Sequence, residues 1–283
     1  NRCVSTSGDY ERFFMVGARR YCHILDPRNG ISPEHYVSVT VVADNCAAAD
    51  AWSTALFVCK LEDVRGELER RGIIYAPESQ RFAHAQQGDA RYYTDAINGA
   101  YRGFFSHNVQ PDLVHIDDID NYTLLYLPYP LGLASATVER LCRWVERGGH
   151  LVSEGLPGYF DARGHVSPTQ PSPALATLFG ARESYVEFTP DLLTELTLRI
   201  GETPVRGGLL LQAYAPTTGQ AVGWYADGQI AAVDNQYGQG HTRLIGTMPG
   251  AGVTAHPDEP APFFRDLLTW AGVEPHLTCT DAR

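Results

Sequence analysis

Hydrophobic and polar residues alternate over short distances in the first part of this chain, which has 283 residues. Runs rich in β-branched and aromatic residues predict three strands, at 10–14, 21–25 and 36–42. An alanine-rich stretch at 46–58 predicts a helix, with Asp44 or Asn45 as its N-cap. The first segment is therefore expected to form a small α+β unit.

The hydrophobic pattern changes at Gly72. Short apolar runs of the kind found in buried parallel strands follow, at 73–76, 113–116, 124–127 and 150–153. Helical stretches at 90–107 and 135–147 separate these runs, and Gly148-Gly149 is a stop signal for the second helix. Alternating strands and helices predict an α/β fold, a doubly wound layer that is flavodoxin-like in outline.

From Leu196 onwards the pattern is typical of antiparallel strands joined by glycine-containing turns. Four such strands are predicted, at 209–214, 220–225, 229–235 and 242–246. A closing helix at 261–271 carries apolar residues at helical spacing, which indicates a face packed on the core rather than a binding site.

A charged run between the two patterns predicts a helical junction at 61–71. We therefore divide the chain into a first segment, 1–60, and a larger α/β domain, 72–283. The sequence leaves two origins open for this arrangement: a natural fusion, or two unrelated sequences joined artificially.

Charge and composition narrow the classes of partner. The chain has 33 acidic and 22 basic residues, and a net charge of −11 argues against a nucleic-acid groove, which needs a concentrated positive field. No apolar stretch approaches the roughly 20 residues of a membrane helix. The six cysteines include no CxxC pair, so reduced thiols in a cytoplasmic protein are expected, although the chain opens without Met.

Candidate metal chemistry lies on the helix predicted at 46–58. Asp50 and Thr54 are four residues apart and therefore share one helix face. A carboxylate and a hydroxyl side by side are suitable oxygen ligands for Mg²⁺. The alternative is that both side chains face water, and that His23 in its Asp-Pro turn is only a turn residue.

The first segment resembles the C-terminal part of the ApbE family, the FAD:protein FMN transferases. The resemblance rests on the order and spacing of four stretches: Ser5-Thr6-Ser7-Gly8-Asp9-Tyr10-Glu11, His23-Ile24-Leu25-Asp26-Pro27-Arg28-Asn29-Gly30, the strand at 37–43 and the helix that holds Asp50 and Thr54.

This resemblance implies Mg²⁺ and FAD as cofactors. It makes Asp50 and Thr54 metal ligands, His23 a catalytic or positioning residue, and His23 with Asp26 part of the cofactor-binding loop. The implied reaction transfers FMN to a protein Ser or Thr and releases AMP; an FAD pyrophosphatase is the related possibility. In the family the flavin pocket is built largely from residues upstream of this segment. We therefore expect the segment to be inactive on its own.

The larger segment resembles the middle, trimerisation domain of family 42 β-galactosidases, which has a class I glutamine amidotransferase-like fold. The matching stretches are 72–79, 122–128, 144–155 and 235–240. The turn after the strand at 150–153 carries Glu154-Gly155 in place of a nucleophilic cysteine. The resemblance implies a non-catalytic role in homo-oligomer assembly, as a trimer.

Open α/β sheets place ligands at the carboxyl ends of their strands. A candidate sugar rim is therefore predicted there, formed by Glu78, Asp117, Asp118, Glu154 and Tyr159. Solvated loop tips are the alternative explanation for these side chains.

Overall fold

The computed structural model describes residues 3–10, 12–43, 45–59, 70–88, 90–107, 109–188 and 196–273. The chain divides into two compact units, residues 1–68 (unit 1) and 69–283 (unit 2). The predicted junction at 61–71 lies outside the described residues, apart from Arg70 and Arg71, which begin a strand.

Unit 1 is a small α+β arrangement. Strand β1 (Cys3–Gly8) pairs antiparallel with β4 (Ser38–Ala43), and β2 (Phe13–Val16) forms a hairpin with β3 (Arg19–Cys22). Helix α1 (Cys46–Val58) packs on β1 and β4, where Ala49 and Phe57 are fully buried.

The helix predicted at 46–58 is confirmed, and Asn45 is its N-cap, because its side chain accepts a hydrogen bond from the Ala48 N–H. Strand β1 was not among the predicted strands, since its serines and threonine give a weak apolar signal.

Unit 2 is built on a nine-stranded sheet with the order β11-β10-β13-β14-β15-β8-β7-β5-β6. Five neighbouring strands are parallel: β6 (Asp112–His115), β5 (Arg70–Tyr75), β7 (Tyr122–Leu127), β8 (His150–Ser153) and β15 (Gly240–Ile245). The other four are antiparallel: β14 (Ile230–Tyr237), β13 (Gln220–Tyr225), β10 (Leu196–Ile200) and β11 (Thr203–Gly207).

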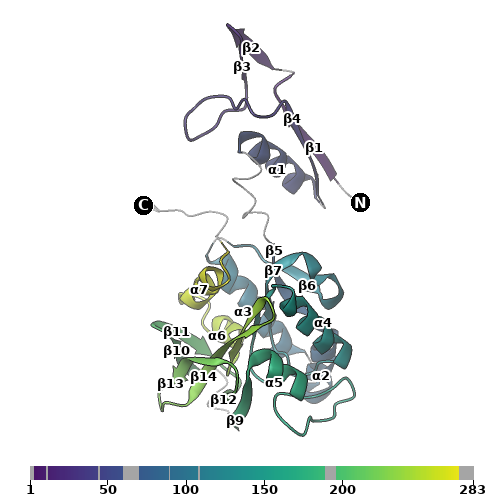
Figure 1. The fold of residues 1–283 in the computed structure, drawn as a ribbon, viewed down its shortest axis with the longest axis vertical. Helices are drawn as coiled ribbons and strands as arrows, with labels where there is room; N and C mark the ends of the chain where they lie inside the picture. The colour runs from purple at the N-terminus through teal and green to yellow at the C-terminus, as the bar shows by residue number, and fades with distance from the viewer. Residues whose placement is uncertain are drawn as a thin grey trace. The chain divides into compact units, whose positions relative to one another are not determined.

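Helices cover both faces of this sheet (Figure 1). Helices α3 (Arg91–Phe105) and α7 (Pro262–Trp270) pack on one face, and α4 (Ser135–Glu146) and α5 (Pro173–Phe179) on the other. Successive residues of the parallel strands enter opposite cores: Leu124 and Tyr126 join the α3 side, and Leu125 and Leu127 join the α4 side.

The remaining elements lie at the ends and edges of the sheet. They are α2 (Pro77–Gln87), the 3-10 helix η2 (Ile116–Asn121), α6 (Pro249–Ala255), and the separate antiparallel pair β9 (Ala181–Glu187) and β12 (Leu211–Pro216). The strand predicted at 209–214 thus exists, as β12, but it pairs with β9 rather than within the large sheet. Within the described residues, no helix is both long enough and apolar enough to span a membrane.

Candidate functional site

A cluster of hydroxyl groups and one carboxylate joins β1 to α1 in unit 1. The Ser5 hydroxyl donates to Asp50 Oδ1 at 3.0 Å. The Ser7 hydroxyl lies 2.9 Å from that of Ser53 and 3.1 Å from that of Thr54. Ser53 is fully buried and Ser7 is 8% exposed, whereas Asp50 and Thr54 are exposed. The structure thus places Asp50 and Thr54 over a buried hydroxyl network.

The other two predicted flavin-loop residues lie outside this cluster. Asp26 is 7% exposed and builds its own turn: its carboxylate accepts from the backbone N–H and the guanidinium of Arg28, and from Asn29. The Arg28 hydrogen bonds hold the pKa of Asp26 below its usual value. His23 is exposed, and no hydrogen bond among the described residues joins it to Asp50 or Thr54.

Glu154 occupies the carboxyl end of β8 in unit 2 and is completely buried. Its Oε1 accepts from the Tyr126 hydroxyl and from the Gly250 N–H, both at 2.8 Å, and its Oε2 accepts from the Tyr129 N–H at 2.8 Å. Burial raises the pKa of Glu154 to about 7, although these hydrogen bonds act in the opposite direction. This side chain links β7, β8 and the start of α6, and it does not reach the solvent-facing rim that the sequence predicted.

Apolar side chains surround Glu154 where the strands end. Tyr129 follows β7, Leu156 follows β8 and Met248 follows β15, and all three belong to one buried cluster. Tyr129 and Leu156 have positive φ angles of 43° and 59°. Buried Gln212 supports this backbone, since its Oε1 accepts from the Leu156 N–H at 2.8 Å. The crevice in which open α/β sheets bind ligands is packed with this chain's own side chains.

The remaining members of the predicted sugar rim do not meet. Glu78 lies in helix α2, not in a loop, and its carboxylate accepts from the Thr137 hydroxyl and the Ala134 N–H at the start of α4. Asp117 and Asp118 are exposed in η2, and Tyr159 is half-buried in the loop after β8. Among the described residues, no hydrogen bond or ion pair connects any two of these five side chains.

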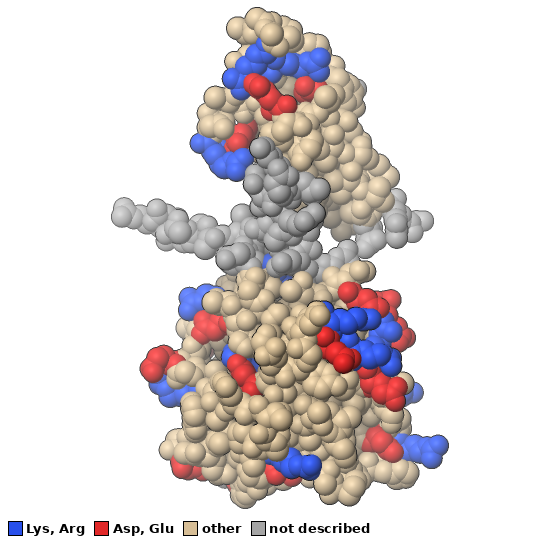
Figure 2. Space-filling view, viewed as in Figure 1, with Lys and Arg blue, Asp and Glu red and all other residues tan. Residues whose placement is uncertain are grey.

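Acidic and basic side chains lie next to one another on part of the surface of unit 2. Blue and red atoms lie side by side on the side that carries α4 and β6 (Figure 2). Arg140 of α4 and Arg147, which follows α4, both pair with Asp120 of η2. In the view of Figure 2 there is therefore no broad, uniformly positive face.

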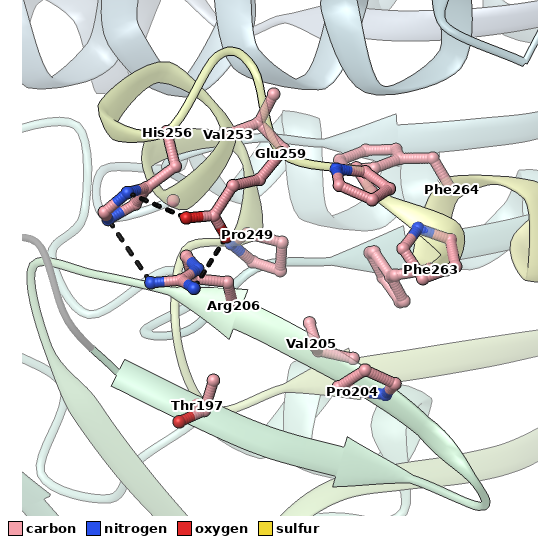
Figure 3. A pocket seen from close by; sticks show the side chains of 14 residues that line it. Thr197, Pro204, Val205, Arg206, Pro249, Val253, His256, Glu259, Phe263 and Phe264 are labelled. Atoms are coloured by element: carbon pink, nitrogen blue, oxygen red, sulfur yellow. Dashed lines mark hydrogen bonds and ion pairs between the residues drawn. The ribbon is translucent and has the colours of Figure 1, made fainter.

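A small cavity of about 120 Å³ lies between β11, α6 and the start of α7 (Figure 3). Its walls are mainly apolar, with Val205, Val253 and Phe263 among them, and Arg206 forms an ion pair with Glu259 at 2.6 Å at one end. A more open depression of about 520 Å³ lies between α4 and the loop that contains Asp161 and His165. Within the described residues, no group of three or more His, Cys, Asp or Glu side chains could hold a metal ion.

Comparison with known proteins decides the affiliation of the larger part of the chain. Residues 70–274 match the family model of the beta-galactosidase trimerisation domain. The chain belongs to this family.

Solved structures share the fold of the trimerisation domain. A GH42 beta-galactosidase from G. stearothermophilus is 20% identical with a TM-score of 0.62, and the match covers 81% of this chain and 34% of that one. The beta-galactosidase from Bacillus circulans sp. alkalophilus is 18% identical with a TM-score of 0.60, covering 82% and 36%. The chain therefore spans about a third of the length of these enzymes.

The residues that precede the trimerisation domain match a different family model. Residues 1–76 match the ApbE family. An FAD:protein FMN transferase from Escherichia coli K12 is 39% identical over 71 residues, which are 25% of this chain and 20% of that relative. The predicted resemblance of both segments is thus confirmed, and the first match spans a fifth of the relative's length.

Some functional candidates were not identified from the sequence. Ser5 and Ser7 belong to a stretch that carries the resemblance to the ApbE family, but their placement against α1 depends on β1 being a strand. The partners of Glu154 in the trimerisation domain come from residues up to 96 positions away, for which no local sequence signal exists.

Proposed function

We propose that residues 70–274 act as a non-catalytic assembly domain that brings copies of the chain together, as a trimer. The match of residues 70–274 to the beta-galactosidase trimerisation domain supports the assembly part of this proposal. The observation that carries the non-catalytic part is the buried carboxylate of Glu154 at the end of β8, whose two oxygens are both engaged by the protein. A group that is buried and satisfied in this way is not available to a substrate.

The topology supports the non-catalytic part of the proposal. Counted from the β6 edge of the sheet, the parallel strands lie in the order β6, β5, β7, β8 and β15. The second of these strands along the chain, β6, therefore lies outside the first, β5, and the other three follow in chain order. This is the flavodoxin-like order, and we infer from it a doubly wound layer related to the class I glutamine amidotransferase fold. Ligands of such folds bind beside the switch between the first and third strands, and here Tyr129 follows the third strand and is buried there.

The oligomeric state of the full chain tests this function. Sedimentation velocity over a hundredfold range of protein concentration is expected to give a particle of three times the 31.1 kDa mass of one chain. A monomer at every concentration would refute the assembly role. Release of ammonia from glutamine, or of galactose from a β-galactoside, that Glu154→Ala abolishes would refute the non-catalytic part.

A second candidate function concerns unit 1, and the hydroxyl cluster beneath Asp50 and Thr54 favours it. We propose that these two residues hold Mg²⁺ for an FAD:protein FMN transferase or FAD pyrophosphatase. The donor set fits the ion, because a carboxylate and a hydroxyl are hard oxygen ligands and Mg²⁺ retains water in its remaining positions. When bound, Mg²⁺ would neutralise charge on the pyrophosphate of FAD.

The residues that the resemblance assigns to FAD fit less well. The Asp26 carboxylate is occupied by Arg28 and Asn29, so it acts as a turn residue, while exposed His23 is available to a ligand. Chromatography of FAD incubated with the chain and Mg²⁺ tests the activity. AMP release that disappears in Asp50→Ala would establish it, and the absence of AMP from a folded sample would exclude it.

A further inference from the structure

The hydroxyl groups that join β1 to α1 form a chain of hydrogen bonds that runs from Ser53 through Ser7 to Thr54. The assignment of protons begins at Ser53, whose hydroxyl donates to the backbone carbonyl of Asp50 at 3.0 Å and to the Ser5 hydroxyl at 3.3 Å. A hydroxyl has one proton, and a carbonyl oxygen can only accept. Ser53 is the donor in both of these bonds, so we assign its single proton to them, at the shorter bond to the Asp50 carbonyl.

This assignment determines the other protons. Because Ser53 has no proton left, the 2.9 Å contact between Ser7 and Ser53 requires Ser7 to donate. Ser7 then has no proton for Thr54, so the 3.1 Å contact between them requires Thr54 to donate to Ser7. The Ser5 proton points to Asp50 Oδ1, since that carboxylate oxygen can only accept.

The result is a set of oxygen lone pairs that point away from the network. Thr54 gives its proton inward, so its lone pairs are directed to the exposed side of α1. Asp50 has one oxygen bound by Ser5, and no hydrogen bond among the described residues occupies its second oxygen. Both free acceptors belong to residues one helical turn apart, on one face of α1.

We propose that Ser5 and Ser7 are positioning residues for a divalent cation held by Asp50 and Thr54. Ser5 fixes the orientation of the carboxylate, and Ser7 forces the Thr54 hydroxyl to present lone pairs instead of its proton. This inference rests on the proposed magnesium site of unit 1. Ser7 and Ser53 are buried, so water does not readily replace either of them in the network.

Binding of Mn²⁺ to the full chain, measured by electron paramagnetic resonance of the free ion, tests the proposal without relying on turnover. Mn²⁺ is the probe because it accepts the same oxygen ligands as Mg²⁺. Ser5→Ala and Ser7→Ala are each expected to weaken Mn²⁺ binding about 10- to 100-fold, the usual effect of removing a group that orients a ligand. Ser5→Thr retains the hydroxyl, so this variant is expected to bind Mn²⁺ with the affinity of the wild-type chain.

Thr6→Ala is the matched control. Thr6 lies between the two serines on β1, points to the opposite side and pairs its hydroxyl with that of Thr40 at 2.9 Å. Its removal is expected to leave Mn²⁺ affinity unchanged. Circular dichroism melting of each variant without metal separates lost positioning from lost folding, because a fold defect lowers the melting temperature in the metal-free state.

The outcomes separate this inference from the function on which it rests. Wild-type chain that binds no Mn²⁺ at millimolar concentration would refute the cation site and, with it, the positioning roles. Binding that Asp50→Ala abolishes, but that Ser5→Ala and Ser7→Ala leave unchanged, would keep the site and refute the positioning roles alone. An equal loss in Thr6→Ala would also refute them, since any change in β1 would then suffice.

Discussion

Replacing Glu154 by Gln changes the buried centre of unit 2 in a way that can be calculated. The carboxylate accepts three hydrogen bonds, from the Tyr126 hydroxyl and from the N–H groups of Tyr129 and Gly250. A glutamine amide has one oxygen and can serve the acceptor role at only one of the two carboxylate positions. One buried N–H group is then left facing the amide NH₂ group, which costs about 1–3 kcal/mol of unfolding free energy.

The second effect of Glu154→Gln is on pH dependence. Burial raises the pKa of Glu154 from 4.5 to about 7, so the folded state binds the proton more tightly than the unfolded state. This contribution to stability is complete below pH 4.5 and is lost as the pH rises through 7. The difference of about 2.5 pKa units corresponds to about 3 kcal/mol lost between these limits, at 1.36 kcal/mol per unit.

Urea unfolding at intervals from pH 4.5 to 8.5, followed by tryptophan fluorescence, measures both effects. We expect the variant to be less stable than wild type at pH 4.5–5, and the gap to close or reverse by pH 8.5. Tyr126→Phe is the control, because it removes a hydrogen bond that lowers the pKa of Glu154 and should move the wild-type transition to higher pH. A stability difference between wild type and Glu154→Gln that is constant across this range would refute the reasoning.

Three further outcomes are expected. Gly99→Ala should lower the unfolding free energy by about 1–3 kcal/mol in urea titrations, because the added Cβ would lie 1.7 Å from the Gly250 carbonyl oxygen and force α3 away from α6. Asn98→Ala, on the exposed face of α3, is the control and should change the unfolding free energy little. Asp234→Asn should cost about 3 kcal/mol in the same assay, because it removes the carboxylate that pairs with buried Arg243 at 2.6 Å; a loss below 1 kcal/mol would contradict this. Calorimetric titration with millimolar galactose should give no heat, because the five predicted rim residues do not converge, and saturable heat would revive the sugar rim.

Local sequence patterns predict those elements whose signal is contained within the element. The alanine-rich run gives α1 to the residue, and the apolar runs locate β5, β6, β7 and β8 because buried parallel strands are apolar on both faces. Helix α2 is not among the predicted elements although Pro77 at its first position is a start signal, because Glu78 is assigned to the rim at the end of the preceding strand.

The candidate sites required information that no local pattern contains. A glutamate after a strand predicts an exposed rim residue, and only the position of α6 reveals that Glu154 is buried against the Gly250 N–H. Likewise, Asp50 and Thr54 are predictable as neighbours on a helix, but Ser5 and Ser7 meet them through a contact between elements 45 to 47 positions apart.

The alternation of cores along the parallel strands limits how unit 2 can be altered. Leu124, Leu125, Tyr126 and Leu127 send successive side chains into the α3 side and the α4 side in turn, and each is at most 1% exposed. Inserting or deleting one residue in β7 would exchange the two sets and place every later side chain of the strand in the wrong layer. Changes in length are therefore confined to the connections between elements, and a new binding surface in this family would have to be engineered there.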